Sequence, residues 1–161
     1  MINKTTLSLL LCVFLSACSM SQPVRAPYTA PDQVQAISQS MIVGKWAVKI
    51  LNPIEGEPAE GGVVEYKSDG TVFAQNSNDA SGLDLEIEMD GTWSIEGDMI
   101  RGTMESIRET SGNPAAKLMI PLLNAMKKTS TGTANIIEAS ANRVVLVATE
   151  GGQAQELTRI Q

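Results

Sequence analysis

The sequence of 161 residues contains no histidine and only two cysteines, Cys12 and Cys18. Histidine is the commonest general base, proton shuttle and transition-metal ligand, so its absence argues against those chemistries. Aromatic residues make up 4% of the chain, which leaves few rings for a surface that stacks on sugars. No Ser-x-x-Lys, Gly-x-Gly-x-x-Gly or P-loop sequence occurs. We therefore expect no enzymatic activity, no metal site and no cofactor.

Basic residues are also few, and acidic residues crowd one stretch. Residues 55–109 hold 14 acidic and three basic residues. Recognition of nucleic acid needs a basic face, so this class of partner is excluded. The acidic stretch would suit a basic protein partner, although acids also simply keep a domain soluble. Alternate acids from Asp84 to Asp90 lie about 6.6–7 Å apart on a strand, too far to wrap one cation.

The first 18 residues have the three parts of an export signal. Lys4 is the only charge before the apolar run Leu7–Leu15, and small residues follow that run. The run is well short of the roughly 20 residues that span a bilayer. The sequence Leu15-Ser16-Ala17-Cys18 then resembles the lipobox of bacterial lipoproteins. This resemblance implies cleavage before Cys18 and a diacylglycerol on its sulfur.

The resemblance also implies a place in the cell envelope. Residue 19 is serine, where aspartate would favour retention in the inner membrane, so we expect a lipid anchor in the outer membrane, with the domain facing the periplasm. Cys12 would leave with the signal, so the mature domain would carry no disulfide. We divide the chain into the signal 1–17, the segment 18–43 (lipidated cysteine, proline-rich tether and a short helix over Asp32–Met41), and a folded domain 44–161.

Alternation of apolar and polar residues over 83–95 gives the clearest structural signal. The odd positions are apolar or glycine, and the even positions are acidic, threonine or serine. A period of two predicts a strand with one face in a core. Gly91 predicts a bend or bulge in its middle. Further strands are expected at 44–51, 61–67, 71–76, 99–107, 132–139, 143–149 and 153–160.

Short glycine-containing connections at 68–70, 96–98 and 150–152 predict antiparallel neighbours. A helical insertion is expected at 113–128, since Pro114 suits the first helical position. We expect this insertion to pack on the barrel, with contact to a membrane surface through Lys127 and Lys128 as the alternative. The predicted fold is mainly β: an eight-stranded antiparallel up-and-down meander that closes into a small barrel. An open half-barrel or a β-sandwich is the alternative.

Two short motifs resemble those of bacterial lipocalin-like domains. Gly44-Lys45-Trp46 opens the first predicted strand, and Gly91-Thr92-Trp93 lies in the longest one. Arg159 lies near the end of the last strand. The resemblance implies that Trp46 and Arg159 meet and close one end of a barrel. The helical insertion departs from the family's layout, in which the main helix follows the eighth strand.

The expected function is non-catalytic binding. An eight-stranded barrel has room for its own side chains or for one small ligand. We expect the ligand to be apolar, such as a lipid or fatty acid, and its wall to comprise Val48, Ile50, Leu85, Ile87, Met89, Trp93 and Met104. The alternative is an envelope module that binds proteins through its acidic face, as an assembly factor or an inhibitor of a basic enzyme.

Overall fold

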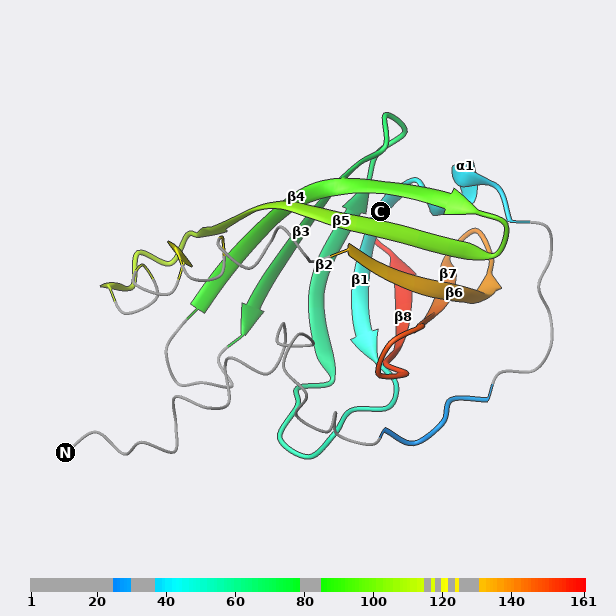
Figure 1. Ribbon diagram of the computed structural model, residues 1–161, viewed down its shortest axis with the longest axis horizontal. Coiled ribbons are helices and arrows are strands. Elements are labelled where there is room, and N and C mark those ends of the chain that lie inside the picture. Colours follow the sequence, from blue (N-terminus) through cyan, green and yellow to red (C-terminus); the bar gives the residue numbers. More distant parts are fainter. Residues whose placement is uncertain are drawn as a thin grey trace.

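The computed structural model describes residues 25–29, 37–78, 85–114, 117, 120–121, 124 and 131–161. Within this part of the chain, eight antiparallel strands follow one another around a closed barrel (Figure 1). A short helix, α1 (Gln39–Ile42), precedes them. The strands are β1 (Gly44–Ile50), β2 (Glu60–Tyr66), β3 (Thr71–Asn78), β4 (Leu85–Glu96), β5 (Met99–Glu109), β6 (Thr131–Ala139), β7 (Arg143–Ala148) and β8 (Ala154–Arg159).

Pairing of the first strand with the last closes the barrel. β1 runs antiparallel to β8, in a register from Trp46 opposite Arg159 to Ile50 opposite Gln155. The predicted up-and-down barrel is thereby confirmed, and the open half-barrel and the sandwich are excluded. Closure gives the outer strands of the meander a partner for their backbone groups.

The inner face of the barrel forms the core because alternate residues of each strand point inward. Trp46, Val144 and Leu157 are fully or almost fully buried. The predicted irregularity at Gly91 is a shift of register between Asp90 and Gly91 in the pairing of β4 with β5. A side chain at position 91 would collide with Thr103, since an added Cβ would lie 2.2 Å from its carbonyl oxygen.

The two ends of the barrel differ. At one end, here called the closed end, lie α1 and the short turns 67–70, 97–98 and 140–142. At the other, here called the loop end, lie the connections 51–59 and 149–153, and β5 ends on this side. Figure 1 shows α1 far from the arrowhead of β1, which points to the loop end.

The expected insertion at 113–128 is described at five positions, Pro114, Lys117, Ile120, Pro121 and Asn124, and all five are helical. The amide nitrogen of Lys117 donates to the carbonyl oxygen of Asn113, as in a helical turn. The remaining residues of the insertion lie outside the described part, as do the expected signal, Cys18 and residues 32–36 of the expected first helix. Among the described residues, no helix is long and apolar enough to cross a membrane.

Candidate functional site

A cavity of about 280 Å³ lies inside the barrel. Seven of the eight strands or their ends contribute to it, so only the closed fold assembles it. Apolar side chains form most of its wall, and polar groups come from Tyr66, Thr133 and two glutamines. Its lining residues are Tyr66, Val72, Trp93, Ile100, Gly102, Gly132, Thr133, Ala134, Leu146, Ala148, Gln153 and Gln155.

Two glycines, which carry no side chain, create this space. Gly102 of β5 pairs with Gly132 of β6, and Trp93 of β4 pairs with Gly102 on its other side. An inward Cβ at Gly102 would come no closer than 4.0 Å to its nearest neighbour, the carbonyl oxygen of Thr92. The two glycines therefore leave room beside Trp93 that an ordinary strand pair would fill.

Trp93 and Tyr66 form the aromatic wall of the cavity. Their rings meet edge to face, with centroids 5.1 Å apart and an angle of 65° between the planes. The indole nitrogen of Trp93 donates to the carbonyl oxygen of Lys67 over 3.0 Å, which fixes the ring. Burial raises the pKa of Tyr66 to about 12, so its hydroxyl stays neutral and can donate a hydrogen bond.

Two glutamines carry a chain of hydrogen bonds from the cavity to the loop end. Gln155 donates from Nε2 to Oε1 of Gln153 over 2.8 Å, and Gln153 donates to Oε1 of Glu57 over 2.9 Å. Arg25 binds the same carboxylate with both terminal nitrogens. Hydrogen bonding from Arg25 holds the pKa of Glu57 below its usual value, despite partial burial. The rim therefore offers the neutral amides of Gln153 and Gln155 to a ligand. The ion pair of Glu57 with Arg25 holds Gln153 in place.

The structure places the residues of the predicted wall in different surroundings. Trp93 is buried and lines the cavity. The others whose side chains are described lie on inward strand positions, buried or half-buried, but are not among its lining residues: Val48, Ile50, Ile87, Met89 and Met104. For Leu85 the structure gives the place on β4 but no description of the side chain.

Sequence reasoning missed most of the residues that line the cavity. One available signal was the alternation along β8, because Gln153 and Gln155 share the inward face with Leu157. The other signal, the pairing of Gly102 with Gly132, depends on a register that one sequence does not reveal.

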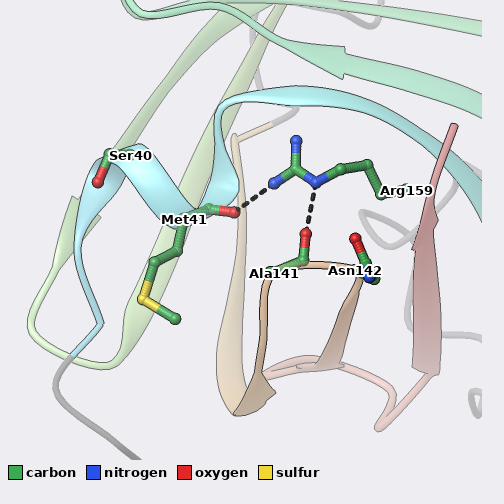
Figure 2. A pocket seen from close by; sticks show the side chains of 5 residues that line it. All are labelled: Ser40, Met41, Ala141, Asn142 and Arg159. Carbon is green, nitrogen blue, oxygen red and sulfur yellow. Dashed lines mark hydrogen bonds between the residues drawn. The ribbon is translucent and has the colours of Figure 1, made fainter. Parts of the chain in front are cut away.

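The structure brings Trp46 and Arg159 together at the closed end. The guanidinium carbon lies 4.0 Å from the centre of the Trp46 ring, which is fully buried. Arg159 also donates to three backbone carbonyls: Nε to Ala141 over 2.5 Å, Nη1 to Val43 over 3.0 Å and Nη2 to Met41 over 3.0 Å. Figure 2 shows this side chain reaching between α1 and the turn after β6.

A surface hollow of about 480 Å³ lies beside this arginine, lined by Ser40, Met41, Ala141, Asn142 and Arg159 (Figure 2). The guanidinium in it is already bound to chain carbonyls on three sides. Its geometry therefore serves to hold α1, β8 and a turn together rather than to bind an anion.

Several acidic residues on the outside of the barrel are held in ion pairs. Arg108 reaches Asp90 over 2.5 Å and Glu88 over 3.3 Å, on the outer face of β4 and β5. Arg143 bridges Glu138 and Glu156, and its pKa is raised by these hydrogen bonds. No group of three or more acidic residues in the described part of the chain is placed to hold a metal ion.

No protein-family model and no curated protein matches the chain. A lipocalin-like protein from Bacteroides uniformis is similar in structure, with 12% identity, a TM-score of 0.46, and coverage of 74% of this chain and 99% of that one. An uncharacterized protein from Bacteroides eggerthii has 18% identity and a TM-score of 0.48, over 74% and 99% of the respective chains. The assignment of the barrel rests on the pairing of its own strands.

Proposed function

We propose that this protein is an outer-membrane lipoprotein, anchored through Cys18, whose barrel binds one compact apolar molecule without transforming it. The cavity of about 280 Å³ beside Trp93 carries the proposal. Sites for small molecules are concave, mostly apolar and equipped with a few polar groups that orient the ligand. This cavity has that composition.

Its size narrows the choice of ligand. Its volume of about 280 Å³ lies at the lower end of the roughly 300–1,000 Å³ of small-molecule sites. A short acyl or alkyl chain fits, whereas a long membrane lipid would have to leave most of its chain outside. Gln153 and Gln155 then favour a neutral end that exchanges hydrogen bonds, such as an alcohol or an amide.

The test uses octanol as the probe and a variant that fills the cavity. Octanol should change the fluorescence of Trp93, and Gly102→Leu should abolish the response because the new side chain takes the ligand's place. Thr103→Leu, which adds bulk on the outer face of the same strand, is the matched control and should respond like wild type. Octanol binding that is equal in all three proteins would contradict a site in the lumen. Hexadecanol should bind more weakly than octanol.

The anchor has its own test. Cys18→Ala should lose both incorporation of a tagged fatty acid and attachment to membranes, because two or more acyl chains are what anchor a protein stably. Ser19→Ala, beside it, should retain both. Undiminished label on the Cys18→Ala protein would overturn the proposed anchor.

A second candidate, a module that binds a basic protein, rests on the outer carboxylates of Glu86, Glu88 and Asp90 along β4. Native mass spectrometry after mild extraction separates the two. A retained small molecule supports binding in the lumen, and a protein complex that dissociates with salt supports the module.

A further inference from the structure

An ion pair fastens the segment before the barrel to the loop end. Nη1 of Arg25 lies 2.5 Å from Oε2 of Glu57 and Nη2 lies 2.8 Å from Oε1, a two-pronged contact. The two side chains are only 12% and 16% exposed, whereas Arg108 in the outer pairs is 52% exposed. A shielded, bidentate pair holds its geometry better than a surface pair does.

Asn52 adds three further bonds at the same place. Its Nδ2 donates to the carbonyl oxygens of Ala26 and Gly152, over 2.9 Å each. Its Oδ1 accepts from the backbone nitrogen of Ala154 over 2.8 Å. The segment 25–29, the connection after β1 and the start of β8 are therefore joined through one side chain.

This junction lies at the rim of the cavity. Gln153 lines the cavity and donates to Glu57, the partner of Arg25. Figure 1 shows the segment 25–29 in blue near the arrowhead of β1, with α1 at the far end of the barrel. Among the described residues, the chain thus first meets the barrel at the loop end, although β1 begins at the closed end.

We propose that this junction turns the rim of the cavity toward a phospholipid surface, so that the ligand passes between the bilayer and the barrel. The inference rests on the proposed anchor at Cys18. From Cys18 to Arg25 the chain reaches at most about 25 Å, at up to 3.6 Å per residue. In the opposite orientation the length of β1, roughly 23 Å at 3.3 Å per residue, and α1 beyond it would stand between the junction and the lipid. That arrangement uses nearly the whole reach of the chain.

The experiment measures which end lies near lipid in the full, lipidated protein. A fluorophore is attached to Glu150→Cys at the loop end or to Asn142→Cys at the closed end, both exposed positions. The mature chain has no other free thiol. In phosphatidylethanolamine vesicles with spin-labelled head groups, fluorescence should be lost at position 150 and retained at position 142. Equal loss at both positions, or greater loss at 142, overturns the proposal.

Variants of the junction show whether it sets the orientation. Glu57→Gln should abolish the difference between the two positions while the protein stays bound to vesicles. Glu88→Gln, which removes a carboxylate from an exposed pair, should preserve the difference. A difference that survives Glu57→Gln overturns the role of the junction. Fatty-acid labelling of Cys18 is scored in every sample: its absence refutes the anchor itself, and its presence with equal quenching refutes only the orientation.

Discussion

Arg159 makes two kinds of contact, a stack on Trp46 and hydrogen bonds to three carbonyls, and a double-mutant cycle separates them. With Trp46→Leu and Arg159→Met, the free energies of unfolding should show a coupling of roughly 0.5–2 kcal/mol from the cation–π contact. Arg159→Met alone should cost more than the coupling, because Met41, Val43 and Ala141 also lose a charged donor. Additive effects of the two substitutions in denaturant unfolding would mean that the ring and the guanidinium are energetically independent.

A glycine is required at position 44 for two reasons, its backbone conformation and the closeness of the Arg159 side chain. Its φ is +139°, and an added Cβ would lie 2.2 Å from Nη1 of Arg159. Gly44→Ala should therefore lower the free energy of unfolding by more than about 1 kcal/mol. Gly132→Ala is the control, because a Cβ there meets nothing within 4 Å. If both variants unfold at the same denaturant concentration, the packing around Arg159 is looser than the structure shows.

The raised pKa of Tyr66 predicts that the protein loses stability at alkaline pH. Its pKa of about 12 in the fold lies above the ordinary 10.0, so the folded state retains the proton longer than the unfolded chain does. This contribution is fully present below the unfolded pKa and disappears as the pH rises through the window between these two values. Tyr66→Phe should lose less stability across that window than wild type does. Parallel curves of unfolding free energy for the two proteins would contradict the assignment.

At the scale of elements, the backbone hydrogen bonding of β5 near the loop end depends on the insertion. In the part of the chain that the structure describes, β6 pairs with β5 from Met99 to Thr103. Further along, the side chain of Asn124 substitutes for a strand: Oδ1 accepts from the amide of Ile107 over 3.3 Å, and Nδ2 donates to its carbonyl oxygen over 3.1 Å. A polar side chain from the insertion thus satisfies backbone groups on this edge of β5.

Asn124→Ala should consequently expose the edge of β5. We expect faster hydrogen exchange at the amide of Ile107, while exchange at Ile100, within the stretch paired with β6, stays unchanged. Lys117→Ala, at an exposed position of the same insertion, is the control. Unaltered exchange at Ile107 in the Asn124 variant would show that the insertion does not protect this edge.

The strands could be read from the sequence because each is an alternation of near neighbours. The expected strand 83–95 is β4 at Leu85–Glu96, and the expected 99–107 is β5 at Met99–Glu109. The bulge at Gly91 was equally local. The bonds of Asn124 to β5 could not be read in the same way, since a side chain that replaces a strand leaves no periodic pattern.

The cavity was harder to foresee because it depends on distant partners. The expected wall followed the apolar faces of three strands, and most of its residues, including Ile87 and Met89, lie on the longest of them. The observed space arises where Gly102 and Gly132 face each other across a pair of strands. Which glycines come opposite each other depends on where β6 resumes after the insertion, and the turn chemistry of the sequence does not specify that.

On the scale of the whole molecule, the two ends of the barrel are held together by different kinds of hydrogen bond. The closed end is tied by one arginine to backbone carbonyls of Met41, Val43 and Ala141. The loop end is tied by side chains to one another, through Arg25, Glu57 and Gln153. We therefore expect substitutions at the first end to act mainly on stability, and substitutions at the second to act mainly on the proposed orientation and the proposed ligand exchange.

The pairing of Trp46 with Arg159 also determines when, during folding, the barrel can close. Local hairpins can form as soon as their two strands exist, but the contact between β1 and β8 must await the last strand. Contacts between residues far apart in the sequence slow folding, and all-β folds that depend on them take milliseconds to seconds. A chain that has emerged only in part has no partner for the outer edge of β1, and its interior stays open. For the proposed export through a membrane this delay is an advantage, because the barrel cannot close until the final strand has passed.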